Sequence, residues 1–188
     1  LVCRKPQLTG VWRLSLACAG ILIAVWPHSA PDTAPADHLN LSNYLLRQGA
    51  HERAMEHACK ALALHPDSPA AMLAFGNACM MQGDYQAALG KFELVLNQNP
   101  DRTDALFNAG LALENLGRPD EACRLYERLV MLEPHHAKAW FALAGMYHAR
   151  RMDAKAQTAL ANAARQLGCD HPEIARMRAK LARSEQSD

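Results

Sequence analysis

Cysteine is the residue type in this sequence best suited to metal binding or nucleophilic chemistry, but the spacing of the six cysteines supports neither role. They include no CxxC pair, and their spacings match no zinc or disulfide framework. Three of them, Cys59, Cys79 and Cys123, lie in helical patterns among alanines and leucines, so we expect them to be buried as small apolar residues. A Cys59–Cys79 bridge between adjacent helices stays open for an oxidising compartment.

Histidine offers a second set of candidate ligands. His135 and His136 are adjacent, but no carboxylate or cysteine stands at a useful spacing from them, which favours a solvated turn between helices. His57 and His148 stand alone in helical patterns. The sequence contains no nucleophile elbow, zinc-protease, P-loop or dinucleotide-binding motif, and no strand pattern. We therefore expect no catalytic, cofactor or metal site, and a protein that is not an enzyme.

The composition favours closely packed helices and argues against a charged partner. Half of the chain is apolar and only 6% is aromatic. Alanine and leucine supply most of the apolar share, and alanine is the best helix former and takes little room. The net charge is +1, so no long-range field points to nucleic acid.

The helical patterns recur with a period of 34 residues. Landmark residues of one unit reappear one for one in the next: Gly76, Gly83, Ala88, Phe92 and Pro100 become Gly110, Gly117, Ala122, Tyr126 and Pro134. The same step outward defines four units, at 35–68, 69–102, 103–136 and 137–170. A fixed period of this length with two helical patterns per unit indicates a helical solenoid.

Small residues at two places of each unit predict where its two helices touch. The eighth place holds Ser42, Gly76, Gly110 and Ala144, and the twentieth holds Ala54, Ala88, Ala122 and Ala156. Larger side chains would overpack a close helix crossing at these places. The fifteenth place holds glycine in the first three units and Arg151 in the fourth, and glycine there predicts a left-handed helix end.

These residues resemble the tetratricopeptide repeat (TPR) family over residues 35–170. The fourth unit shows the family pattern clearly, with Trp140-Phe141-Ala142-Leu143-Ala144 followed by Tyr147. The resemblance implies an all-α, right-handed solenoid of four antiparallel helix pairs. After it, Ile174, Met177 and Leu181 are spaced three and four apart on a basic segment, which predicts a capping helix within 171–188, followed by a disordered tail.

The resemblance also implies a binding groove, because in this family the first helix of each unit lines a concave surface. The groove residues that it implies are Asn43, Arg47, Leu73, Asn77, Met80, Met81, Phe107, Asn108, Leu111, Lys138, Phe141 and His148. The same places of the repeat also hold Leu39, Leu46, Asp104, Glu114 and Asn115. Exposed apolar residues rimmed by polar groups usually mark a binding site. Methionine would let such a surface adapt to varied apolar anchors.

Asparagine in the groove is suited to holding a peptide, because its amide both donates and accepts hydrogen bonds. Asn77, Asn108 and Lys138 match three places of the clamp with which some family members hold a carboxylate at a peptide's C-terminus. Leu73 and Ala142 occupy the other two clamp places. Recognition of two carboxylates is therefore in doubt, and binding of another kind of peptide is the expectation.

The first residues resemble an export signal or a membrane anchor. Arg4, Lys5 and Arg13 precede an apolar run over 14–26, and a proline-containing linker follows over 27–36. We expect 1–26 to be a cleaved signal or an uncleaved anchor, inserted in an inner membrane through 11–26. The repeats would then face the periplasm or be exported.

The sequence thus predicts a non-enzymatic adaptor that binds a partner peptide or helix in the groove. A bacterial envelope complex, for a pilus, secretion or cytochrome maturation, is the setting suggested by analogy with the family. Two alternatives stay open. The repeats could self-associate into a structural homo-oligomer, or the chain could be a regulatory subunit of a separate enzyme.

Overall fold

The computed structural model describes residues 35–168 and 171–185, and these residues form α-helices joined by short turns. The helices are α1 (Pro35–Arg47), α2 (His51–Leu64), α3 (Pro69–Gln82), α4 (Tyr85–Gln98), α5 (Thr103–Asn115), α6 (Pro119–Leu132), α7 (Ala137–Ala149), α8 (Asp153–Leu167) and α9 (Pro172–Glu185). The described part of the chain contains no strand, in agreement with the sequence patterns.

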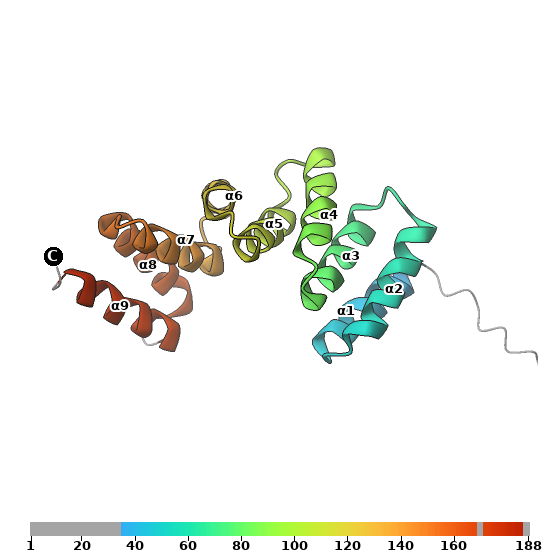
Figure 1. Cartoon of the computed structure of the whole chain (residues 1–188), viewed down its shortest axis with the longest axis horizontal. Helices are drawn as coiled ribbons and strands as arrows, with labels where there is room; N and C mark the ends of the chain where they lie inside the picture. The colour runs from blue at the N-terminus through green and yellow to red at the C-terminus, as the bar shows by residue number, and fades with distance from the viewer. Residues whose placement is uncertain (1–34, 169–170, 186–188) are drawn as a thin grey trace, which may run out of the picture. The chain divides into compact units, whose positions relative to one another are not determined.

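The helices pack as successive pairs, and the all-α solenoid is confirmed. Each unit contributes two antiparallel helices, α1 with α2, α3 with α4, α5 with α6 and α7 with α8 (Figure 1). The second helix of one unit also packs against the first helix of the next, so that α2 contacts α3, α4 contacts α5 and α6 contacts α7. The second to fourth units and α9 share one hydrophobic core, and Ala58 of the first unit packs with Ala74 and Ala78 of α3 in a second, smaller cluster.

Close contact between a glycine and an aromatic ring sets the spacing within the two central pairs. A Cβ atom on Gly76 would lie 2.5 Å from Cε1 of Phe92, and one on Gly110 would lie 2.5 Å from Cε1 of Tyr126. Both rings are fully buried. The predicted contact place is therefore correct, and the small residue is needed because a ring occupies the space that a side chain would take.

The first unit uses a hydrogen bond where the central units use a ring. Its twenty-fourth place holds Ala58, so no aromatic side chain fills the gap opposite Ser42. Ser42 is fully buried, and its Oγ donates to the carbonyl oxygen of Ala54 at 2.9 Å. The bond satisfies the buried hydroxyl and joins α1 to α2.

The turn inside each unit has a left-handed residue at the predicted fifteenth place. Gly83 has a φ of 82°, and Gly49 and Gly117 are similar. Arg151 adopts the same conformation, with a φ of 59°. The geometry of the repeat therefore imposes this turn even where the residue is not glycine, at a steric cost of about 1–2 kcal/mol.

The cysteines follow the burial prediction at two positions out of the three described. Cys79 and Cys123 are buried, and burial raises the pKa of the Cys79 thiol to about 11. Cys59 is exposed, so the prediction of burial is wrong there. It lies on α2 next to Ala58, which is the residue that faces the core. All three thiols are free, and the structure contains no Cys59–Cys79 bridge.

The sequence patterns suggested that His57 stands alone, but in the structure it contacts a second histidine. Nδ1 of His57 lies 2.8 Å from Nδ1 of His38 on α1, and the two rings are tilted against each other with centroids 5.1 Å apart. Desolvation and the neighbouring His38 lower the pKa of His57. The two imidazoles therefore join the helices of the first unit, one nitrogen donating and the other accepting.

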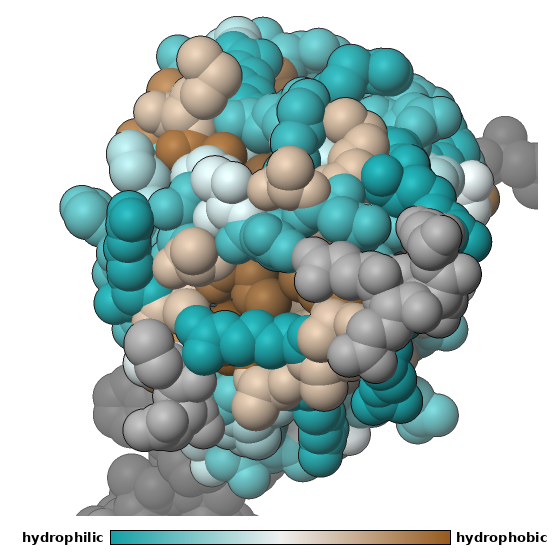
Figure 2. All heavy atoms as spheres, turned by 90° about the vertical axis from the view of Figure 1, so that its left-hand side faces the viewer, coloured by the Kyte–Doolittle hydropathy of each residue, from teal (hydrophilic) through white to brown (hydrophobic). Residues whose placement is uncertain are grey.

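The capping helix α9 covers the last unit with the predicted residues. Ile174 and Leu181 are buried, and Met177 is half-buried against the core. A shallow pocket of about 230 Å³ between α8 and α9 is lined by Gln157, Leu160, Ala161, Arg178, Leu181 and Ala182. Figure 2 views the molecule from this end and shows hydrophobic atoms in a hollow surrounded by hydrophilic ones.

The predicted membrane segment cannot be compared with these helices. Residues 1–26, and the linker as far as residue 34, lie outside the described residues. The last two residues of the expected linker belong to α1. Within 35–168 and 171–185, no helix has the length and apolar character needed to cross a bilayer.

The glycine–aromatic contacts generate a stability prediction. Gly110→Leu should lower the free energy of unfolding by about 1–3 kcal/mol, because the added side chain has to displace the ring of Tyr126. Gly90→Ala is the matched control, since a Cβ on this α4 residue would meet nothing within 4 Å. It should raise the free energy of unfolding by about 0.5–1 kcal/mol. Urea unfolding of both variants measures the difference, and equal stabilities would contradict the contact.

Candidate functional site

The first helices of the units line a groove that holds two neighbouring pockets. One pocket, of about 410 Å³, lies over α1, α3 and α5 and is called here the amide pocket. It is lined by Asn43, Leu46, Arg47, Asn77, Met80, Met81, Asn108 and Leu111. The two pockets share Leu111 of α5, so they adjoin along the same helix.

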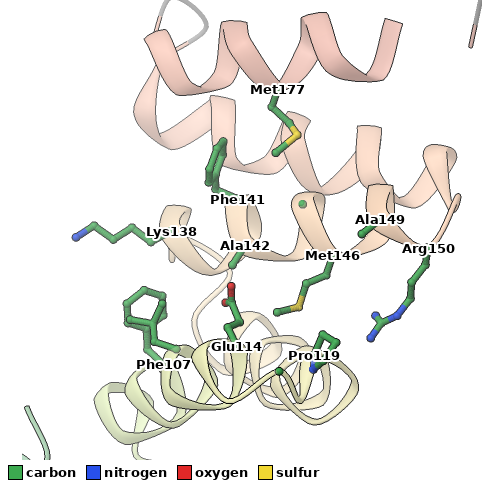
Figure 3. A pocket seen from close by; sticks show the side chains of 13 residues that line it. Phe107, Glu114, Pro119, Lys138, Phe141, Ala142, Met146, Ala149, Arg150 and Met177 are labelled. Carbon is green, nitrogen blue, oxygen red and sulfur yellow. The ribbon is translucent and has the colours of Figure 1, made fainter. Parts of the chain in front are cut away.

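The other pocket is larger, about 820 Å³, and is called here the apolar pocket. It lies between α5, α7 and the capping helix α9 (Figure 3). It is lined by Phe107, Leu111, Glu114, Gly117, Pro119, Lys138, Phe141, Ala142, Gly145, Met146, Ala149, Arg150 and Met177. The volume falls in the range of pockets that bind small molecules or the anchor residues of a peptide.

Most of the predicted groove residues line these two pockets. Asn43, Arg47, Asn77, Met80, Met81, Asn108 and Leu111 belong to the amide pocket, and Phe107, Leu111, Lys138 and Phe141 to the apolar pocket. The first helices therefore bring them together as the repeat pattern implied. Their role in binding a peptide stays a prediction.

Two predicted groove residues lie outside both linings. Leu73 is buried with 7% of its surface exposed and belongs to the hydrophobic core. Its side chain escapes water there, whereas Phe107 and Phe141, at the same place of the next two units, line the apolar pocket. His148 is placed by Asp153 at the start of α8, whose Oδ1 lies 3.2 Å from its Nδ1. This contact joins the two helices of the fourth unit.

Several lining residues of the apolar pocket were not selected from the sequence. Gly145 and Ala149 have the periodicity of groove positions, but they are too small to suggest a binding role by themselves. Met177 was assigned only to the packing of the capping helix. A Cβ on Gly145 would lie 3.7 Å from the Met177 methyl carbon, so α9 borders the pocket directly above α7. Only the packing of α9 reveals this wall.

The amide pocket contains a hydrogen bond between two of its asparagines. Nδ2 of Asn108 donates to Oδ1 of Asn77 at 3.0 Å, and both side chains are partly buried. The bond holds the two amides side by side across α3 and α5. The N–H groups of the Asn77 side-chain amide can then donate to a ligand, and the side-chain oxygen of Asn108 can accept from one.

The apolar pocket contains one carboxylate, and a buried tyrosine holds it. The Tyr126 hydroxyl donates to Oε1 of Glu114 at 2.6 Å, and the ring of Tyr126 is fully buried against Gly110. Burial and the hydrogen bond to Glu114 raise the pKa of Tyr126 above its usual range. The hydroxyl therefore stays protonated and donates at physiological pH.

Ring contacts also position Phe107 in the lining of the apolar pocket. Its ring centroid lies 5.8 Å from that of Tyr126 and 4.9 Å from that of His136. His136 is not simply part of a solvated turn, because its Nδ1 accepts from the backbone N–H of Ala139 at 3.1 Å. The histidine caps α7 and also supports Phe107.

The described residues contain no group of three or more histidine, cysteine or acidic side chains that could hold a metal ion. The chemistry that these pockets offer is hydrogen bonding through amides in one and apolar contact around a single carboxylate in the other.

The bond between Tyr126 and Glu114 generates the second prediction. Tyr126→Phe should lower the free energy of unfolding by about 1–2 kcal/mol, since a hydrogen bond to a charged acceptor is lost while the ring packing is kept. Phe92 shows that phenylalanine fits the equivalent space beside Gly76.

Tyr85→Phe is the control, because the Tyr85 hydroxyl has no hydrogen bond within the described part of the chain. It should change the free energy of unfolding by no more than about 0.5 kcal/mol. Thermal or urea unfolding checks both variants, and equal losses would show that the bond to Glu114 adds no stability.

Known structures share this architecture. The crystal structure of MamA matches with a TM-score of 0.64 and 22% identity, over 80% of this chain and 83% of that one. A thermophilic TPR protein of Thermus thermophilus matches with a TM-score of 0.66 and 19% identity, over 83% and 84%. The first TPR of Spaghetti (RPAP3), bound to the HSP90 peptide SRMEEVD, matches with a TM-score of 0.59 and 23% identity, over 62% and 93%. These likenesses show the fold.

Sequence comparison points to the same repeats. Over 119 residues the chain is 28% identical to Superkiller complex protein 3 of Mus musculus, and the match covers 63% of this chain but only 8% of that protein's length. Residues 29–168 match the family model of the cilia and flagella-associated protein 70 middle TPR-like domain. The chain therefore belongs to this family of TPR-like domains, and the resemblance to tetratricopeptide repeats is confirmed.

Proposed function

We propose that this chain is a non-enzymatic adaptor that binds a segment of a partner protein in the groove formed by its first helices. The observation that carries the proposal is the continuous lining of the amide and apolar pockets, which meet at Leu111. A TPR-type repeat is a protein-interaction fold. A groove with polar groups in one half and apolar groups in the other suits a peptide better than a small metabolite.

The amide pocket is suited to an extended part of the ligand. An extended peptide exposes N–H and C=O groups along its length, and these need partners when water is displaced. Asn43, Asn77 and Asn108 can both donate and accept, so they match either group. Arg47 adds a positive charge at the same pocket. Next to the amides, the adjacent methionines of α3 offer adaptable apolar contact.

The apolar pocket is suited to the anchor side chains of the ligand. Phe107, Phe141 and Met177 provide apolar surface that a free chain exposes to water and a bound ligand would cover. The peptide complex of the RPAP3 repeat supports a peptide occupant, because that domain has the same fold. The peptide that this chain binds differs from one held by two carboxylates, because Leu73 and Ala142 occupy two places of the carboxylate clamp.

The place of action that we propose is the outer side of a bacterial inner membrane, in assembly of an envelope complex. It rests on the basic and apolar pattern of residues 4–26. The repeats would then meet their partner in the periplasm or after export.

A peptide selection tests the groove. The full chain should retain a set of peptides from a display library of random 12-residue peptides. The double variant Asn77→Ala/Asn108→Ala should bind these peptides at least about tenfold more weakly, because two amides that bind the peptide backbone are removed. Asn97→Ala on the exposed side of α4 is the matched control and should bind as the wild type does.

All variants are melted alongside, so that loss of folding is separated from loss of binding. Equal retention by the double variant and the control would contradict the groove assignment. Failure of the wild type to retain any peptide would contradict the proposed function itself.

The membrane assignment has its own test. In this test, residues 1–36 are fused to the N-terminus of a phosphatase that is active only after export. The fusion should show phosphatase activity, and it should remain in the membrane fraction after a carbonate wash. Removing 11–26 from the fusion should abolish both results, because the apolar run supplies the insertion energy. An inactive fusion would contradict export, and an active fusion released by carbonate would contradict anchoring.

A further inference from the structure

The third repeat differs from the other three in the chemistry of one pair of places. Its twenty-fourth place holds Tyr126 and its twelfth place holds Glu114, and the two side chains are hydrogen-bonded. The corresponding pairs are Ala58 and Leu46 in the first unit, Phe92 and Met80 in the second, and Leu160 and His148 in the fourth. A carboxylate held by a buried hydroxyl is therefore a specific feature of this unit and not a consequence of the repeat pattern.

The hydrogen bond fixes where the carboxylate stands. Because the ring of Tyr126 is wedged beside Gly110, its hydroxyl cannot move far, and Glu114 Oε1 is held 2.6 Å from it. Oε2 accepts no hydrogen bond from the described residues. Figure 3 shows the Glu114 carboxylate directed into the space between α5 and α7, and Ala142 of α7 lines the same pocket. The bond thus presents one acceptor oxygen to whatever fills the pocket.

Among the described residues, Glu114 has no ion-pair partner. Of the two cations in the lining, Arg150 forms its ion pair with Asp120. Lys138 forms no ion pair with the described residues, and in Figure 3 its side chain extends away from the pocket. A ligand that covers the apolar lining would remove water from Glu114, and an unpaired carboxylate in such a place is costly. A complementary occupant therefore carries a positive charge opposite Glu114.

The shape of the pocket favours a helix as the occupant. Its floor on α7 consists of small residues spaced three and four apart, Ala142, Gly145 and Ala149, between the larger Phe107 on one side and Met177 on the other. Small floor residues let another helix approach to an axis distance of about 8–10 Å. The lining follows α7 from Lys138 to Ala149, a length of about 18 Å that matches three to four turns of a parallel helix.

Backbone chemistry supports the same choice. The walls formed by Phe141, Met146 and Met177 offer no hydrogen bonds to an extended peptide. A helix satisfies its own backbone groups and needs none from the walls.

We propose that the apolar pocket binds an amphipathic helix of the partner protein, and that Glu114, positioned by Tyr126, selects a helix with one lysine or arginine among its apolar anchors. This inference rests on the proposed peptide-binding function and names the kind of segment that the apolar half of the groove receives.

The test uses two synthetic 18-residue helical peptides. Both are alanine-rich with three leucines along one face, and they differ only in a single residue on that face, lysine in one and glutamine in the other. The wild-type full chain should bind the lysine peptide about tenfold more tightly than the glutamine peptide in a fluorescence anisotropy titration. Glu114→Gln should abolish this preference, and Tyr126→Phe should reduce it. Glu52→Gln, an exposed residue of α2 outside both pockets, should keep it.

Two further variants distinguish the failures. Phe141→Ala and Met177→Ala should weaken both peptides alike, because both remove apolar contact without changing charge. If neither peptide binds, or if these variants have no effect on binding, the pocket is not a peptide site and the proposed function fails in this half of the groove. If binding depends on Phe141 and Met177 but the wild type shows no preference for lysine, the selection by Glu114 is wrong and the peptide site stands. Melting curves of every variant exclude unfolding as the cause.

Discussion

The shape of the groove depends on a contact between a glycine of the first helix and a buried aromatic ring of the second helix in each central unit. At Gly76 and Gly110 a ring from the second helix lies where a Cβ atom would be, so the two helices of each central unit cross closely. That crossing determines the angle at which the first helix presents its other face. The residues of this face line the amide and apolar pockets. The packing inside a unit and the lining of the pockets outside it are therefore consequences of the same helix geometry.

The same contact connects the core with the chemistry of the pocket in the third unit. Tyr126 fills the space beside Gly110 as Phe92 does beside Gly76, but its hydroxyl continues beyond the ring and reaches Glu114. A core residue thereby positions a charged group at the surface. Exchanging phenylalanine for tyrosine at this place of a repeat can thus add a hydrogen-bond donor with little change in packing, since the two residues have nearly the same ring.

The capping helix α9 does more than cover the apolar residues of the last unit. Helix α9 buries Ile174 and Leu181, as expected of a cap, and its Met177 closes one side of the apolar pocket beside Gly145. A groove lined by repeats alone would be open there. The capping helix therefore gives the last part of the groove a shape that the repeating units do not have, and it makes the apolar half of the groove different from the amide half.

The class of fold, the helix pairs of the four units and most of the residues that line the two pockets could be predicted from the sequence. This was possible because the period of 34 residues repeats the same local requirements, such as small residues at helix crossings and a left-handed residue in each turn. Other contacts, each made by one side chain with a residue elsewhere, became visible only once the helices had packed. Leu73 turns into the core, His148 contacts Asp153, and Met177 meets Gly145. None of these follows from periodicity, because each depends on the direction that one side chain takes in the packed structure.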